Sequence, residues 1–270
     1  MKKVIYYFKS KEFILSMFIL LTMTFVNILS GLISTNRIEG VNCFSFWNYS
    51  LHYGIGSAVM FLSPIIIAYI SLTDFYYKFF GSYLKNAMLR KKYFKIFFKE
   101  LFLSYIKAWV PFAIISLISF IFAYMKFPHN IITTYASQYT MFKYEGLTNP
   151  YIFIALSFVQ TFLYVIMITN ISLIILYLTK KLMVSYIITL VATNAINIIV
   201  GNVLIFIGES IGNEKFLNYI HNVNVFEGYF VQSNMINAIL HTSIYVFITF
   251  ITVIAIYRKK EKLVILNEVV

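Results

Sequence analysis

The sequence predicts an all-α integral membrane protein of six transmembrane helices, with both termini in the cytoplasm. Composition, six long apolar stretches and the placement of positive charge lead to this prediction. Of the 270 residues, 60% are hydrophobic, 19% aromatic and only 12% charged, and the mean hydropathy is +0.80. A soluble chain carries about 25% charged residues, so we expect most of this apolar surface to face lipid. The composition also excludes disorder, and the single cysteine excludes a disulfide-rich scaffold.

The apolar stretches have the length that a membrane requires. A helix crosses the hydrocarbon layer with about 20 apolar residues, and its backbone must be hydrogen-bonded internally. The predicted spans, all within a single transmembrane domain of residues 1–270, are 13–34, 54–73, 101–125, 151–178, 182–208 and 238–257. The stretches are continuous and therefore lack the alternation of an outer-membrane barrel.

The amino-terminal stretch has a second interpretation, a cleaved signal sequence. Its apolar run exceeds the roughly 7–15 residues of a signal core, so we favour a true span. Val4, Ile5, Phe8 and Glu12 before it predict a short amphipathic elbow on the inner leaflet.

Most of the 22 Lys and Arg residues lie on one side of the predicted spans. They occupy the amino terminus, the segment 74–100, the turn between spans four and five, and the tail. The opposite loops hold only Arg37, Lys126, Lys143 and Lys215. The positive-inside rule therefore places both termini in the cytoplasm. Because topology explains the net charge of +12, we expect no nucleic-acid partner.

No motif predicts catalysis by this chain. The four histidines, His52, His129, His221 and His241, are scattered and lack the spacing of a metal site. A G-x-S-x-G motif and a G-x-x-x-x-G-K-[ST] motif are both missing from the sequence. We therefore expect no enzymatic activity, no metal and no cofactor bound by this chain. Because the centres of the spans hold no Asp or Glu, any transport is better driven by a separate ATPase than by an ion gradient.

Span three contains a cation and a proline. Pro111 is expected to kink or break the helix. Lys107 lies about 9 Å from the inner end of the span at 1.5 Å per residue. We favour the interpretation that Lys107 snorkels to the interface over a functional charge inside the membrane.

Span five carries a stripe of polar and small residues. Thr189, Thr193, Asn197 and Gly201 recur every four residues and therefore share one helix face. Such a face suits close helix packing, which we favour, or the wall of a conduit. The two uses coincide if the conduit lies at a subunit interface. Together with Asn27 in span one, these residues are the candidates for a substrate path or a dimer interface.

Two segments lie on the outer side of the predicted spans. Residues 209–237 alternate acidic and apolar side chains, which is typical of amphipathic helices in the outer leaflet and equally of an ordinary amphipathic loop. Residues 35–53 are expected to form an outer loop. Cys43 in that loop has no partner for a disulfide, and nothing marks its thiol as reactive.

The segment 74–100 reads DFYYKFFGSYLKNAMLRKKYFKIFFKE. Its aromatic residues can dock into a groove, and its lysines and arginines can form a charged rim. A rigid helix at this place can transmit the movement of a partner into the bundle. A basic helix that only binds anionic lipid has the same charges. We favour coupling, because lipid attraction requires neither Asp74 nor the Gly81-Ser82 pair.

The order of residues in this segment resembles the membrane subunits of type 2 ATP-binding-cassette exporters. An acidic residue is followed by Gly-Ser, a Lys-containing helix, an Arg and a Lys that leads into span three. The matching positions are Asp74, Gly81, Ser82, Lys85, Asn86, Arg90 and Lys99. The Pro-x-Ser that usually precedes the Arg is replaced here by 87–89. The six-span plan, the basic elbow and the amphipathic stretch before span six extend the resemblance over the whole chain.

The resemblance implies a transmembrane subunit of an ATP-driven exporter in a bacterial cytoplasmic membrane. It implies a dimer with a second copy or a paralogue, and a separate cytoplasmic ATPase that holds ATP and Mg. Coupling would use Asp74, Gly81, Ser82, Tyr83, Lys85, Asn86 and Arg90. Small members of this kind resemble permeases for the export of, or immunity to, antimicrobial and cytolytic peptides, so an amphipathic peptide is the expected substrate. The alternative is a membrane sensor or accessory protein that recruits a cytoplasmic partner without transport.

Overall fold

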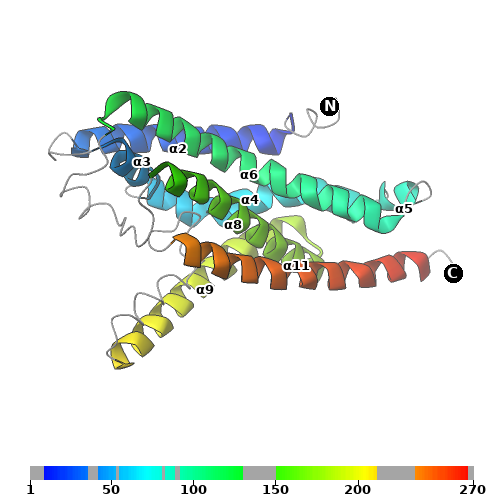
Figure 1. Ribbon diagram of the computed structural model, residues 1–270. Coiled ribbons are helices and arrows are strands. Elements are labelled where there is room, and N and C mark those ends of the chain that lie inside the picture. Colours follow the sequence, from blue (N-terminus) through cyan, green and yellow to red (C-terminus); the bar gives the residue numbers. More distant parts are fainter. Residues whose placement is uncertain are drawn as a thin grey trace.

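In a computed structural model of the chain, the described residues form helices. The structure describes residues 9–35, 42–52, 55–80, 83–88, 92–129, 150–211 and 235–266, and within these ranges it contains no strand (Figure 1). The helices are α2 (Lys11–Thr35), α3 (Cys43–His52), α4 (Ile55–Phe79), α5 (Tyr83–Met88), α6 (Tyr93–Lys126), α8 (Pro150–Thr179), α9 (Leu182–Ile211) and α11 (Met235–Leu266). The predicted all-helical class is confirmed for this part of the chain.

Four helices in the described ranges are long and apolar enough to cross a membrane. They are Lys11–Ile33, Tyr93–Lys126, Ile154–Thr179 and Ala238–Arg258. Each coincides with one of the six predicted spans. The other two predicted spans fall on α4 and α9, which have 25 and 30 residues, and within α9 the stretch Leu182–Ile196 forms a shorter apolar segment. These helices therefore support a membrane protein, and the number of six spans stays a prediction.

The helices that flank α5 are longer than the predicted spans. α4 continues to Phe79 and α6 begins at Tyr93, so the segment 74–100 consists largely of the ends of two helices. α5 itself has only six residues. α6 runs through Pro111 as one uninterrupted helix of 34 residues, so the proline does not break it.

The bundle has two recognisable ends. In Figure 1, α5 and the end of α11 lie at one end, and α2 begins on the same side. We call this the α5 end, and the opposite end, where α3 lies, the α3 end. α8 and α11 run side by side, whereas the second half of α9 projects away from the other helices. α9 follows α8 through a tight turn in which Lys180 has a φ of 54°.

α3 fills the α3 end of the bundle, where the sequence predicted only a loop. Cys43, Phe46 and Trp47 are almost completely buried between α2, α4 and α6. The Trp47 indole nitrogen donates a 3.1 Å hydrogen bond to the Ser116 carbonyl of α6. Burial raises the pKa of the Cys43 thiol and so disfavours the reactive thiolate. The sequence did not predict this helix, because α3 is too short and too mixed in composition to be recognised as apolar; the outer position of 35–53 stays a prediction.

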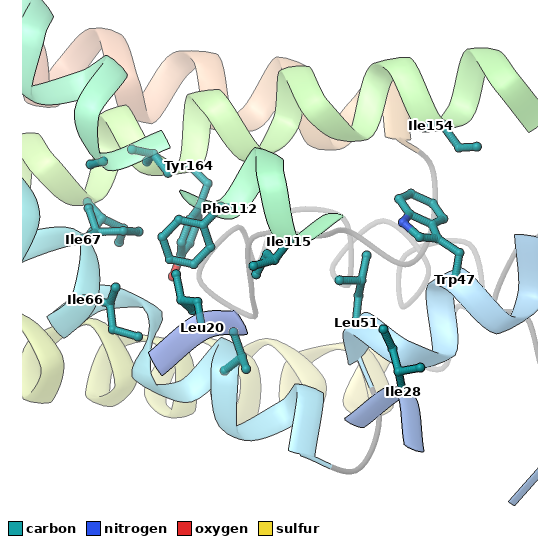
Figure 2. Packing of buried hydrophobic residues seen from close by; sticks show 14 of the residues in the cluster. Leu20, Ile28, Trp47, Leu51, Ile66, Ile67, Phe112, Ile115, Ile154 and Tyr164 are labelled. Atoms are coloured by element: carbon teal, nitrogen blue, oxygen red, sulfur yellow. The ribbon is translucent and has the colours of Figure 1, made fainter. Parts of the chain in front are cut away.

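Two clusters of buried side chains form the core. The first lies toward the α3 end, and Figure 2 shows side chains from α2, α3, α4, α6 and α8 meeting in it. The second lies toward the α5 end and is rich in aromatic residues. In lipid there is no hydrophobic gain from bringing apolar helices together, so close packing and hydrogen bonds between helices must hold the bundle.

This packing predicts that α3 is a structural part of the bundle. Trp47→Ala removes a buried ring and the hydrogen bond to Ser116, and we expect a loss of about 3 kcal/mol in stability. Phe18→Ala on α2 is the matched control, because that ring is 68% exposed. Unfolding of the detergent-solubilised protein measures both. Equal stability of the two variants would show that α3 does not anchor the bundle.

Candidate functional site

Two ion pairs join α4 to α6 beside α5. Lys107 Nζ lies 2.6 Å from Asp74 Oδ2, and Lys78 Nζ lies 2.5 Å from Glu100 Oε2. Asp74 and Lys78 are one turn apart on α4, and Glu100 and Lys107 are two turns apart on α6. The two pairs therefore face each other along one line of contact between the helices.

Each pair contains one deeply buried member. The side chains of Lys107 and Glu100 are 3% and 6% exposed, whereas those of Asp74 and Lys78 are 33% and 20% exposed. A buried charge without a counter-charge is strongly destabilising, by about 3–5 kcal/mol. Both buried members lie on α6, and α4 supplies the counter-charge for each of them.

The interpretation that Lys107 snorkels to the interface was wrong. Its ammonium points to Asp74 instead and lies almost completely out of contact with solvent. Asp74 was assigned to the cytoplasmic segment, but α4 continues past it and brings its carboxylate opposite Lys107. In the interior of a bundle, a carboxylate within hydrogen-bond reach outweighs the gain from stretching a lysine to a distant interface.

An aromatic cluster lies next to the ion pairs. The Phe75 and Phe79 rings of α4 stack with centroids 4.2 Å apart, and Phe97 of α6 lies 6.1 Å from Phe75 at nearly a right angle. Tyr257 of α11 meets the Phe75 ring edge-on at 5.4 Å. Such edge-to-face and offset contacts are favourable. The cluster therefore joins α4, α6 and α11 immediately beside α5.

Hydrogen bonds extend this cluster to α8. The Tyr93 hydroxyl of α6 donates to the Tyr257 carbonyl at 3.0 Å, and the Tyr257 hydroxyl donates to the Leu173 carbonyl of α8 at 3.3 Å. Leu84 of α5 is 2% exposed and belongs to the same cluster. Leu84 thus joins α5 to the buried cluster that α4, α6, α8 and α11 share.

The predicted coupling residues have the following positions. Asp74 forms the ion pair with Lys107. Tyr83, Lys85 and Asn86 lie on the short helix α5. Gly81, Ser82 and Arg90 lie outside the described residues. The structure thus brings Asp74 and α5 to the same end of α4, and their use in coupling stays a prediction.

The predicted polar stripe on span five faces the bundle in its first half. Thr189 and Thr193 are 0% and 3% exposed, and both hydroxyls donate to carbonyls one turn earlier in α9, those of Ser185 and Thr189. Nearby, the Tyr186 and Thr73 hydroxyls are 2.7 Å apart and tie α9 to α4. Both threonines are therefore buried in the bundle, and their use in helix packing or in a substrate path stays a prediction.

The other three candidates for a substrate path or dimer interface lie in two different places. Asn27 of α2 is 1% exposed, and its amide donates to the Ser50 carbonyl of α3. Asn197 and Gly201 lie in the second half of α9, which projects from the bundle in Figure 1. Asn27 therefore holds α3, and the use of Asn197 and Gly201 in a substrate path stays a prediction.

Sequence reasoning did not identify the polar contacts of α8. Its Gln160 amide donates to the Thr242 hydroxyl of α11 at 2.8 Å, and its Asn170 amide donates to Thr249 at 3.2 Å. Asn170 also accepts a 2.5 Å hydrogen bond from the Tyr105 hydroxyl of α6. Pairing of this kind between helices leaves no spacing signal in the sequence.

No group of three or more His, Cys, Asp or Glu side chains that could hold a metal ion occurs among the described residues. Comparison with known proteins finds no matching family model, no matching curated protein and no matching solved structure. Functional inference therefore depends on the residues and contacts of this chain.

The unequal burial of the Asp74–Lys107 pair predicts unequal effects of mutation. Asp74→Asn leaves a buried ammonium without a counter-charge and should cost about 3–5 kcal/mol in stability. Lys107→Met should cost less, because the Asp74 carboxylate is 33% exposed and keeps contact with solvent. The double variant should recover most of the loss. Unfolding of the four proteins in detergent gives a double-mutant cycle.

Lys99→Gln is the control for this cycle. Lys99 lies 3.8 Å from Glu100 but is 55% exposed, so its removal should change stability by less than about 1 kcal/mol. The buried ion pair between Asp74 and Lys107 is contradicted if Asp74→Asn lowers stability no more than Lys107→Met does. It is also contradicted if the stability losses of the two substitutions simply add in the double variant.

Proposed function

We propose that this chain is the transmembrane subunit of an ATP-driven exporter in a bacterial cytoplasmic membrane. In this proposal it has six spans and cytoplasmic termini, and it works with a second copy or a paralogue and with a cytoplasmic ATP-binding-cassette ATPase. The single observation that carries the proposal is the attachment of α5. A short helix between two long ones is held to the bundle by Leu84, while two ion pairs lock the helices on either side of it.

This arrangement suits the transmission of force. If a partner displaces α5, the ion pairs prevent α4 and α6 from sliding past each other, so both helices move together. The aromatic cluster passes the displacement to α11 and α8 through Tyr257. Closely packed interiors shift as units rather than deform continuously, so a local push can become a rotation of several helices.

The long helices suit an amphipathic cargo. Large apolar side chains on α9, among them Val191, Ile198 and Phe206, are 61%, 61% and 71% exposed. Lipid or a second subunit covers such a surface in a membrane. In the proposal, the second half of α9 with Asn197 and Gly201 contributes to the path or to the dimer interface. An amphipathic peptide is the proposed substrate, and the partner ATPase holds ATP and Mg.

The proposal predicts that charge reversal on the segment of α5 releases the ATPase. Lys85→Glu with Arg90→Glu should reduce ATPase activity that co-purifies with the membrane subunit by at least tenfold, because like charges then face the partner. Lys259→Glu with Lys260→Glu is the matched control, since it reverses two charges at the same end of the bundle, on α11. The control should retain the activity.

The measurement uses protein solubilised from its native host in mild detergent, with ATP hydrolysis measured on the purified complex. Unchanged activity of the Lys85/Arg90 variant contradicts the assignment of this surface. If the ATPase binds but its rate does not respond to an added amphipathic peptide, the chain is an accessory or sensor protein and not a transporter.

A further inference from the structure

Exposed cations from two helices lie at the α5 end of the bundle. Lys95 and Lys99 are one turn apart near the beginning of α6, and Arg258 lies in the second half of α11. The Tyr93 hydroxyl bonds the Tyr257 carbonyl at 3.0 Å, so the first turn of α6 lies beside the turn of α11 that contains Arg258 (Figure 1). The positive charges of α6 and α11 therefore lie at about the same level along the bundle.

The two helices turn the same side outward. α6 packs against α4 and α8, and α11 packs against α8, so their exposed sides share the opposite face of the bundle. Phe97 and Tyr257 point inward, where their rings meet at 5.4 Å. Phe98, which is 42% exposed, meets Phe250 of α11 at 6.4 Å and closes the contact between the helices on the outer side. Lys95 lies one turn before Phe98 on this outer face.

Exposed apolar side chains continue from these cations toward the middle of the bundle. Phe102 follows Lys95 by seven residues on α6 and is 58% exposed, and Ile251 precedes Arg258 by seven residues on α11 and is 49% exposed. Seven residues extend about 10 Å along a helix. The headgroup layer of a bilayer is about 5–8 Å thick on each side. When the cations lie among the headgroups, these apolar side chains therefore lie within the hydrocarbon layer.

Few carboxylates oppose the positive charge of this face. Among the described residues, no carboxylate forms an ion pair with Lys95 or Arg258. Glu100 is only 6% exposed, and its two oxygens already face two lysines, Lys78 at 2.5 Å and Lys99 at 3.8 Å. The next carboxylate along α11 in the sequence is Glu261, and lysines occupy positions 259, 260 and 262 around it. The face therefore has an excess of positive charge and attracts an anion.

An anionic phospholipid has the complementary order of groups, with a negative headgroup above apolar chains. A zwitterionic lipid fits less well, because its own ammonium cancels the phosphate charge. An acidic segment of a cytoplasmic protein does not reach apolar side chains within the hydrocarbon layer. We propose that Lys95, Lys99 and Arg258 bind the phosphate of an anionic phospholipid, whose acyl chains cover Phe102 and Ile251. This site goes beyond the proposed function, because it requires neither the ATPase nor a cargo and leaves α5 free for coupling.

The test is binding of lipid to the full-length chain in neutral maltoside micelles, measured by native mass spectrometry. The probes are dioleoyl phosphatidylglycerol and dioleoyl phosphatidylcholine, which have the same acyl chains and differ in net charge. We expect phosphatidylglycerol to bind the unaltered chain at least tenfold more tightly, because each nearby cation adds to the attraction. Inorganic phosphate at millimolar concentration should not displace it, because phosphate has no apolar chains.

Substitutions of exposed side chains test the residues without disturbing buried packing. Lys95→Gln with Arg258→Gln should weaken binding of phosphatidylglycerol about tenfold and leave that of phosphatidylcholine within twofold. Lys95→Arg with Arg258→Lys keeps both charges and should bind phosphatidylglycerol within threefold of the unaltered chain. Lys180→Asn with Lys181→Gln is the matched control, because it removes two exposed cations from the turn between α8 and α9, and asparagine tolerates the positive φ of Lys180. The control should bind phosphatidylglycerol within twofold, and all variants should keep the unfolding midpoint of the lipid-free protein.

Four results overturn the proposal. The first is equal affinity of the unaltered chain for the two lipids, and the second is unchanged binding of phosphatidylglycerol after Lys95→Gln with Arg258→Gln. The third is an equal loss in the Lys180/Lys181 control, which would indicate attraction by net charge alone. The fourth is displacement of the lipid by inorganic phosphate, which would identify an anion site that needs no acyl chains. None of these measurements involves an ATPase or a peptide, so failure of this site and failure of the exporter function are distinguishable.

Discussion

The rest of this structure depends on the counter-charge that Asp74 supplies to the buried Lys107 ammonium. A charge removed from water must be paired, and here the partner is on the neighbouring helix. Sliding α4 against α6 by one turn would separate the two groups by about 5.4 Å. The pair therefore fixes the register of these helices. Because the register is fixed, Lys78 meets Glu100 as well, and α5 is held at a defined distance from the core.

Polar contacts hold the other helices together as well. Apolar surface gains little from leaving lipid for another apolar surface, so polar contacts decide which helices stay together. α8 has a central role, because it bonds α4 through Tyr164 and Ser63 at 3.2 Å, α6 through Asn170 and α11 through Gln160. α9 is bound differently, with contacts to α4 and α8 near its beginning and a second half that projects from the bundle. This contrast makes α9 the helix best suited to move against the others.

Helical class and membrane character could be predicted from the sequence, because long apolar runs have only one stable arrangement in lipid. The spacing of Thr189 and Thr193 also predicted their shared face correctly, since helix geometry alone determines it. The partner of Lys107 could not be predicted, because Asp74 is 33 residues away and its proximity depends on where α4 ends. α3 was missed because its burial arises from contacts with three other helices and not from its own hydropathy.

The most direct test of the fixed register between α4 and α6 is a pair of spin-label distances measured with and without ATP on the proposed partner ATPase. The single cysteine simplifies it, since Cys43→Ser removes the only native thiol. Labels at Tyr77 and Lys99 report on α4 and α6, and labels at Tyr77 and Phe206 report on α4 and α9; all three side chains are exposed. The account predicts an unchanged, narrow Tyr77–Lys99 distance and a shifted Tyr77–Phe206 distance. A Tyr77–Lys99 distance that shifts or broadens would contradict it, because α4 and α6 would then not move as one unit.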